Sequence, residues 1–456
     1  APDTDNLCRT WVGGIGGYAT VAYSDVENSA TLSLAGSHNS LYAGGLFGYI
    51  SSTLTNGVNS GDVTVEPNTT MAGFLLFGGC CGKFANAVTN IENSGTVTVG
   101  EGATTGNNTY IVGGLAFSDS TNEFTIKSIV NRGAVVVNGT FGKNLNVASC
   151  LGTWNENVKQ YFYDGNNYSP ITVNATVNGT EAVVGGVAAY MRGSGSRGLH
   201  NHKTGVINVN ITTTTGKLAV GGIAYGLRHQ LNKAAEGESA NGNDADIFVT
   251  ASTATTLDVA GLITTPNNYN RNYATNNGNI IITGATVGTD LRVGGAECNH
   301  NYGKNTTGYT NTGNITIDAT TKVQGSACIG GISGGDALAQ YHDNPHNWSD
   351  CSNSGNITFS GEAGLSGTGN VKLGGMMGSM SFSGTYDPIH KITNGFTNSG
   401  NVTYDGKLLS EAGNVYVGGI IGDLKLNTKT VDWNGLVVNT GTLSLLGSYK
   451  GKSYMG

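Results

Sequence analysis

Short segments in which every second residue is apolar recur along the whole chain, and glycine and asparagine separate them. Twelve times a small or aliphatic residue precedes Gly-Gly, or a near variant, and another aliphatic residue follows. After each run an Asn-x-Gly-like turn leads into a short alternating segment; the clearest copies pair residues 417–420 with 439–445 and residues 329–332 with 353–359. The Gly-Gly pairs, or the positions aligned with them, begin near residues 13, 44, 73, 113, 148, 185, 221, 260, 294, 330, 374 and 418.

This spacing amounts to roughly one unit per 37 residues, within the range typical of stacked repeat architectures. Because one such unit cannot bury its own apolar face, the units must stack and share a continuous core. The period of two and the abundance of Val, Ile and Thr indicate strands rather than helices. We therefore predict an all-β fold, a single continuous parallel β-helix (β-solenoid) of about twelve coils over residues 1–456. The handedness rule for parallel crossovers favours a right-handed coil.

The eleventh unit shows how one repeat would form one coil. Residues 371–373 alternate and meet Gly-Gly, and two further alternating segments follow at 392–396 and 401–404. Three short strands per coil are therefore expected, with the aliphatic residues beside Gly-Gly and after Asn-x-Gly turned inward. These inward residues are Val417, Ile420, Val402, Ile357, Ile332, Ile315, Val293, Ile280, Val220, Ile207 and Val184.

The asparagine of Asn-x-Gly recurs at one position of the repeat. Asparagine and glycine tolerate left-handed backbone and suit a tight corner between strands. Stacked coils would place these asparagines in a column, where their side chains hydrogen-bond to one another. The predicted column contains Asn59, Asn93, Asn131, Asn311, Asn353, Asn398 and Asn439.

Both ends of the sequence suggest an open stack. Residues 453–456 resemble the start of a thirteenth Gly-Gly unit, and we expect a piece of a longer chain. The first coil (8–34) and the last (415–446) carry few of the lysines and prolines that blunt exposed sheet edges. We therefore expect self-association by axial stacking, or continuation of one long chain, through Trp11, Tyr18, Leu443, Leu445 and Tyr449.

The Gly-Gly-aliphatic-x-Gly runs at residues 44–48 and 418–422, with the shorter 13–16, resemble the GLUG-type repeats of large bacterial surface proteins. The resemblance covers the whole chain at the level of the repeat. It implies an extracellular β-solenoid used for adhesion or as a fibre.

Composition narrows the possible partners. Charged residues make up 12 % of the chain and the net charge is −7, with no basic stripe, so nucleic acid and anionic membranes are poor partners. No apolar run reaches the roughly 18 residues of a membrane-spanning helix. The 7 cysteines form no CxxC motif, and an odd count disfavours a full disulfide framework. We expect them to be buried as small apolar residues.

The sequence gives little support for a catalytic site or a metal-binding site. Asp244 and Asp246 share strand parity, and Asp336, Asp343 and Asp350 lie close in sequence, but no focused acidic patch repeats. Residues 200–202 and 342–346 place histidines at spacings compatible with a metal pair. Metal-bound imidazoles need a fixed hydrogen-bonding environment, which asparagine-rich or proline-broken loops do not reliably supply. We assign no catalytic residue, no metal ligand and no cofactor.

Tyrosine beside asparagine offers the most promising polar surface. Tyrosine gives rigid amphipathic contact and asparagine adaptable hydrogen bonding, a combination suited to adhesion and sugar binding. We expect these residues in longer loops, where they bind a partner such as a surface glycan or merely cover the edges of the core. The candidate binding residues are Tyr161, Tyr163, Tyr168, Tyr269, Tyr273 and Tyr302.

The sequence thus favours a noncatalytic extracellular structural or adhesive protein, a surface filament subunit or adhesin stalk. The alternatives are a carbohydrate-active β-helix enzyme, such as a polysaccharide lyase or hydrolase, and a glycan-binding module. A carboxylate pair facing a groove would favour the enzyme. End-to-end contacts between copies would favour the filament.

Overall fold

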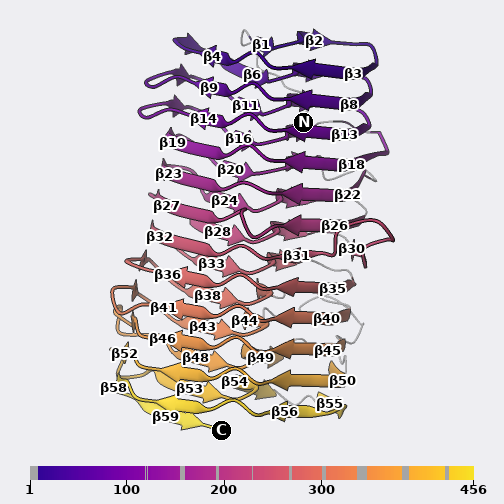
Figure 1. Ribbon diagram of the computed structural model, residues 1–456. Helices are drawn as coiled ribbons and strands as arrows, with labels where there is room; N and C mark the ends of the chain where they lie inside the picture. The colour runs from indigo at the N-terminus through magenta and orange to yellow at the C-terminus, as the bar shows by residue number, and fades with distance from the viewer. Residues whose placement is uncertain are drawn as a thin grey trace.

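The computed structural model describes residues 9–118, 120, 122–154, 160–191, 195–227, 230–266, 270–299, 305–335, 347–382, 390–426 and 431–456. Within these ranges the chain forms strands and no helix, and the strands build four parallel sheets that run the length of one stack. Figure 1 shows the coils lying one above another from β1 to β59. The predicted parallel β-solenoid is confirmed.

Each coil passes through the four sheets in the same order, and we name the sheets A to D. Sheets A and B flank the Gly-Gly bend. The 13 strands of sheet A are β1 (Arg9–Gly13), β6 (Ser40–Gly44), β11 (Leu75–Gly78), β16 (Thr109–Val112), β20 (Leu145–Ala148), β24 (Glu181–Gly185), β28 (Lys217–Gly221), β33 (Leu257–Ala260), β38 (Leu291–Gly294), β43 (Ala327–Gly330), β48 (Val371–Gly374), β53 (Asn414–Gly418) and β59 (Lys452–Met455). The 12 strands of sheet B are β2 (Gly16–Ala19), β7 (Phe47–Ile50), β12 (Cys81–Phe84), β17 (Leu115–Ser118), β21 (Leu151–Trp154), β25 (Ala188–Met191), β29 (Ala224–Leu227), β34 (Ile263–Pro266), β39 (Glu297–Asn299), β44 (Ser333–Gly335), β49 (Met377–Phe382) and β54 (Ile421–Leu426).

Sheets C and D complete the coil and lie on the right and left of Figure 1. The 14 strands of sheet C are β3 (Tyr23–Asn28), β8 (Leu54–Asn59), β13 (Val88–Asn93), β18 (Phe124–Asn131), β22 (Gln160–Asn167), β26 (Gly195–Asn201), β30 (Gln230–Leu231), β31 (Gly242–Asn243), β35 (Arg271–Asn276), β40 (Asn305–Asn311), β45 (Asn347–Asn353), β50 (His390–Asn398), β55 (Val431–Asn434) and β56 (Val437–Asn439). The 20 strands of sheet D, two per coil where the strand is split, are β4 (Leu32–Leu34), β5 (Ser37–His38), β9 (Val63–Val65), β10 (Thr70–Met71), β14 (Val97–Val99), β15 (Thr104–Thr105), β19 (Val135–Phe141), β23 (Ile171–Val177), β27 (Ile207–Thr213), β32 (Ile247–Thr253), β36 (Ile280–Ile282), β37 (Thr286–Val287), β41 (Ile315–Ile317), β42 (Lys322–Val323), β46 (Ile357–Phe359), β47 (Glu362–Ala363), β51 (Val402–Tyr404), β52 (Lys407–Leu408), β57 (Leu443–Leu445) and β58 (Ser448–Tyr449).

We number coils from the sheet A strand that opens each, so that β1 opens coil one and β53 opens coil twelve. The expected thirteenth start is confirmed, because β59 pairs with β53 and sets Tyr454 beside Tyr416. Two sequence expectations were wrong in detail. Each coil has a strand in four sheets rather than three, because the short strand after Gly-Gly was not recognised as a separate element. The third Gly-Gly begins at Gly78 and not near residue 73.

The interior contains two main apolar clusters. One lies between sheets A and D and contains Val184, Val220 and Ile357; the other lies between sheets B and C and contains Ile332. Ten of the eleven residues predicted to point inward are fully or almost fully buried, and Ile420 is partly buried against the B–C cluster. The predicted register is therefore confirmed.

Each of the three glycines in the Gly-Gly-aliphatic-x-Gly motif is required for a different steric reason, as coil two illustrates. A side chain at Gly44 would collide with the backbone of the next coil at Cys81, and one at Gly45 would collide with the side chain of Asn59. The last glycine, Gly48, packs against sheet A, where an added Cβ would lie 2.6 Å from the Val12 nitrogen. The bend therefore requires glycine because three layers of backbone and side chain meet there.

An asparagine ladder runs through the stack at the corner after sheet C. Each interior member donates one N–H to the next asparagine in the column, at 2.7–3.2 Å, and one to a nearby carbonyl of its own coil. The seven predicted members are present, and five more extend the column. Its twelve members are Asn28, Asn59, Asn93, Asn131, Asn167, Asn201, Asn243, Asn276, Asn311, Asn353, Asn398 and Asn439.

Candidate functional site

The described candidate tyrosines lie on or beside sheet C and not in long loops. Tyr161 and Tyr163 are on β22, Tyr168 directly follows it, and Tyr273 is on β35. The loop prediction is therefore wrong for these four, because Asp164, with a φ of 58°, bends the strand without ending it. The asparagines and glycine around it gave this strand the composition of a loop. Tyr269 and Tyr302 lie outside the described residues.

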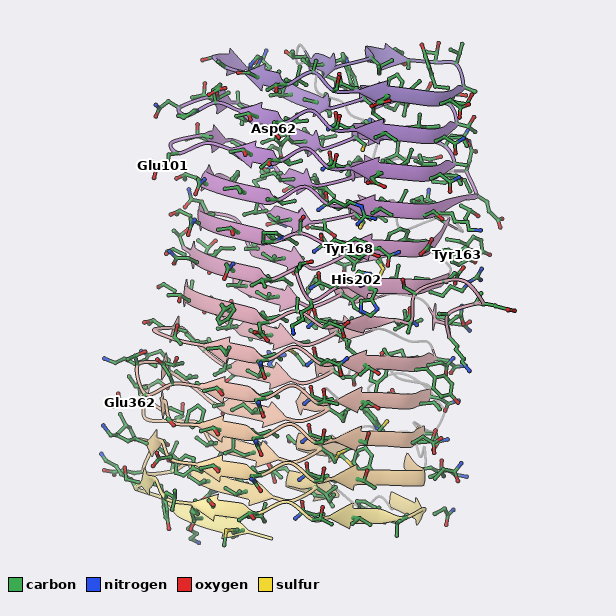
Figure 2. The ribbon with its side chains drawn as sticks, viewed as in Figure 1. Asp62, Glu101, Tyr163, Tyr168, His202 and Glu362 are labelled. Carbon is green, nitrogen blue, oxygen red and sulfur yellow. The ribbon has the colours of Figure 1, made fainter. Side chains whose placement is uncertain are left out.

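Tyr168 forms the centre of a stacked column on the outer side of this corner. Its ring stacks on His202 at 3.9 Å with the planes 8° apart, and the Arg132 guanidinium lies 4.5 Å from the ring centre. Arg132 is in turn 3.0 Å from Glu92. Figure 2 shows Tyr168 and His202 beside each other in the middle of the stack. Contacts within the chain thus occupy the ring of Tyr168, which leaves less of it for a sugar.

Tyr163 and Tyr273 also pack against cations of the same chain, and the ring of Tyr161 lies 5.8 Å from that of Tyr163. The Arg197 guanidinium lies 3.9 Å from the Tyr163 ring centre and donates to both oxygens of Glu238 at 2.8 and 3.0 Å. Lys233 lies 5.3 Å from the ring of Tyr273, which is half exposed. The arrangement favours the interpretation that these tyrosines cover the sheet, while Tyr273 keeps the largest free surface.

Below Tyr168 the column continues into a cluster of His200, His202 and Asp244. The two imidazoles stack at 4.2 Å, and His200 Nε2 is 2.8 Å from a carboxylate oxygen of Asp244. Among the described residues this is the one group of three potential metal-ligating side chains, with ligand atoms within 4.8 Å of one another. His200 lies on β26 and not in a loop, contrary to the sequence interpretation.

The buried carboxylates of the described chain have cationic partners. Glu297 pairs with Arg271 at 2.6 Å inside the B–C core. On the outer side of sheets A and B, Asp258 lies 3.6 Å from Arg292 and Asp423 lies 2.7 Å from a lysine. Burial raises the pKa of Glu297 and of Asp258, while the neighbouring arginines oppose that shift.

Two of the five acidic residues considered for catalysis bond to asparagines. Asp244 accepts from Asn277 at 2.7 Å, and Asp246 accepts from the side chain of Asn279 at 2.9 Å. Asp350 lies on β45, and Asp336 and Asp343 lie outside the described residues.

The cysteines behave as buried apolar residues. The six described ones are free thiols, five of them buried, and Cys8 lies outside the described residues. Burial raises the pKa of the thiols of Cys81, Cys150, Cys328 and Cys351 to about 12, which keeps them protonated and unreactive.

The residues expected to support axial assembly lie in the first and last coils. Leu443 and Leu445 are only partly buried, whereas Val402 and Tyr404, which precede them in the same columns, are 0 % exposed. The ring of Trp11 stacks on Tyr42 at 4.4 Å.

The other two expected residues are exposed. Tyr18 is 56 % exposed beside Tyr49, and Tyr449 is 39 % exposed. The structure thus brings these five residues to the two ends of the stack and not to a single site.

The fold is a twelve-coil parallel β-solenoid, and the exposed large apolar residues of the described chain lie mainly in its first and last coils. Comparisons with protein-family models, curated proteins and solved structures gave no match. Among the described residues no helix has the length and apolar character to cross a membrane.

Proposed function

We propose that the protein is a noncatalytic structural or adhesive solenoid of the cell exterior, which lengthens when copies stack end to end. The observation that carries this proposal is the position of the exposed apolar side chains. Of the fourteen exposed large apolar residues in the described part of the chain, three lie in coil one and seven within residues 421–456. Exposed apolar clusters of this kind are typical of association surfaces.

The register of the stack supports the proposal that a second copy of the chain covers the exposed apolar residues at its ends. Tyr454 continues the sheet A column that begins with Trp11, and each end of this column already carries a stacked aromatic pair, Trp11 with Tyr42 and Tyr416 with Tyr454. A copy added below β59 in the same register would set its Trp11 against Tyr454. Aromatic stacking of this kind adds roughly 0.5–1.5 kcal/mol beyond the buried area.

The asparagine ladder gives the contact a direction. Each interior asparagine donates to the next one toward the C-terminal end, so the column is polar. Asn28 begins the column and Asn439, which accepts from Asn398 at 2.7 Å, ends it, so the two ends of the stack present different groups. Leu32 and Leu443 likewise stand at the two ends of one sheet D column, and both are only partly buried. Copies would therefore associate head to tail, a heterologous contact that forms filaments.

Sedimentation velocity and electron microscopy over increasing protein concentration test the proposal. We expect species longer than one chain that disappear in the double variant Leu436→Lys/Leu446→Lys, which places charge on two end residues that are 69 and 70 % exposed. The matched control is Phe248→Lys on the side of the stack, which should assemble normally. A wild-type chain that stays monomeric at every concentration would contradict end-to-end stacking.

Salt provides a second test of the register. Lys452 and Arg9 share one column, so the proposed contact brings two cations together. Because salt screens like charges, assembly should strengthen as ionic strength rises. Assembly that weakens steadily with salt would indicate another contact.

A further inference from the structure

The strands of sheet C are interrupted between coils six and seven, where the cluster of His200, His202 and Asp244 lies. In coil seven the strand is split into β30 and β31, and each pairs with β26 through only two residues. The preceding pair, β22 with β26, is matched at six residues. The histidines belong to coil six and Asp244 to coil seven, so the cluster connects the two coils where the pairing of sheet C is interrupted.

His200 is oriented by a backbone carbonyl from the segment between β30 and β31. Its Nδ1 lies 2.8 Å from the Ala240 oxygen, which can only accept, so Nδ1 carries a hydrogen. Its Nε2 lies 2.8 Å from Asp244 Oδ2, which is also an acceptor when ionised. Two lone pairs at this distance repel each other, so a hydrogen must lie between Nε2 and the carboxylate, or a metal ion if the two atoms move slightly apart.

In His202 the ring nitrogen with a partner outside the cluster is Nε2, whereas in His200 it is Nδ1. Asn166 donates its amide to Asp164 at 2.7 Å, which turns Asn166 Oδ1 toward His202 Nε2 at 2.9 Å. Nε2 is then the donor, and Nδ1 keeps its lone pair.

Asp244 is held in the same manner. Its Oδ1 accepts from Asn277 Nδ2 at 2.7 Å, and Thr312 donates to Asn277 Oδ1 at 2.8 Å, which fixes the orientation of that amide. Each of the three side chains thus has one polar atom bonded to a partner outside the cluster. Partners of this kind orient metal ligands and set their tautomers.

We propose that His200, His202 and Asp244 bind a divalent first-row transition-metal ion, with Zn²⁺ as the representative, and that the ion clips coil six to coil seven. Two neutral imidazoles and one carboxylate suit such an ion better than Mg²⁺ or Ca²⁺, which prefer oxygen ligands. Metal–ligand bonds of about 2.0–2.2 Å bring ligand atoms to about 3.3 Å from one another, so the three side chains must move closer and the two stacked rings must tilt relative to each other to bind the ion. Three protein ligands leave a further coordination position for water.

Zinc titration of the full chain, stripped of metal with a chelator, tests the site by calorimetry. We expect one ion per chain, a loss of about tenfold to 100-fold in affinity for Asn277→Ala, which touches the ion only through Asp244, and a larger loss for His202→Ala, which removes a ligand. His38→Ala is the matched control, because this histidine lies in coil one, and it should bind as the wild type does. Cobalt(II) should give a visible spectrum without a thiolate charge-transfer band.

Several outcomes would overturn the proposal. A wild-type chain with no saturable zinc binding would do so. Binding that survives His200→Ala combined with His202→Ala would also do so, as would binding lost only in His342→Ala/His346→Ala, whose residues lie outside the described ranges. Circular dichroism of each metal-free variant checks folding, and the conservative His200→Gln replaces any variant that fails it.

Discussion

Replacing Asn311 by alanine should lower the free energy of unfolding by about 3–5 kcal/mol, because several buried polar groups lose their partners at once. Asn311 is fully buried. It donates to the Gly313 carbonyl at 2.9 Å and to Asn353 Oδ1 at 2.7 Å, and it accepts from Asn276 Nδ2 at 2.8 Å. The variant leaves three buried groups unsatisfied, at about 1–3 kcal/mol each, and partial entry of water brings the sum toward the lower end.

Asn314 provides the matched control in the same coil. It also bonds to asparagines above and below, at 3.1 Å to Asn279 and 2.9 Å to Asn356, but this second column is exposed. Water can replace those partners, so Asn314→Ala should cost less than about 1 kcal/mol.

Hydrogen exchange of the amides in β40 and β45, read with the denaturation midpoint, measures the difference between the two variants. A stacked repeat can open locally, so the opening free energy of these strands reports the effect directly. Equal losses for Asn311→Ala and Asn314→Ala would refute the reasoning, since burial of the ladder would then contribute nothing.

Asn311→Asp separates hydrogen bonding from side-chain volume. At neutral pH its carboxylate could not donate to Asn353, and burial would raise its pKa above the unfolded value of about 3.9. The folded state then binds more protons than the unfolded state. The variant should be most stable below about pH 4 and lose stability as the pH rises.

Three further predictions follow from packing. Gly334→Ala should cost about 1–3 kcal/mol by thermal unfolding, because the new Cβ would lie 2.6 Å from the Val293 carbonyl oxygen, whereas at Gly16 the nearest atom is 3.5 Å away and alanine should be tolerated. Ile332→Asp should disrupt folding of its coil through a buried charge, while Val58→Asp on the outer face should melt like the parent; equal melting of the two would contradict the register. The five buried thiols should resist iodoacetamide at pH 8 in the native protein and react fully in denaturant, and their rapid native alkylation would show that the core opens.

The fold could be predicted from the sequence because every coil places the same steric requirements on its residues, so the same pattern of residue types recurs along the chain. Val, Ile and Leu at alternate positions identify the buried faces, and Gly-Gly identifies the bend. Only ladder asparagines with a glycine two residues later were predicted, because the prediction relied on the Asn-x-Gly motif. At Asn28, Asn167 and Asn243 the carbonyl two residues on belongs to alanine or serine instead. The ladder requires an asparagine and a carbonyl, and any residue supplies the carbonyl.

The surface chemistry could not be predicted in the same way. His200 and Asp244 are 44 residues apart, and the carbonyl that orients His200 comes from Ala240, in the segment that splits sheet C. Only the register of β26 with β31 brings these groups together. The sequence shows that His200 and His202 are two residues apart, but it does not show which nitrogen of either ring carries a hydrogen. The third ligand and the hydrogen-bond partners depend on one irregular coil within a regular stack.

That irregular coil also determines where the stack should open first. In a solenoid each coil is stabilised by its two neighbours, so a break forms where the contact between neighbours is weakest. Coil seven is the weakly paired coil, because sheet C contributes only four paired positions between it and coil six and three between it and coil eight, against seven between coils four and five. A metal ion at His200, His202 and Asp244 would act at this break and bind the closed stack more tightly than the open one. Hydrogen exchange should then show β30 and β31 opening before β18 and β22 in the metal-free chain, and zinc should reduce that difference by slowing exchange in β30 and β31.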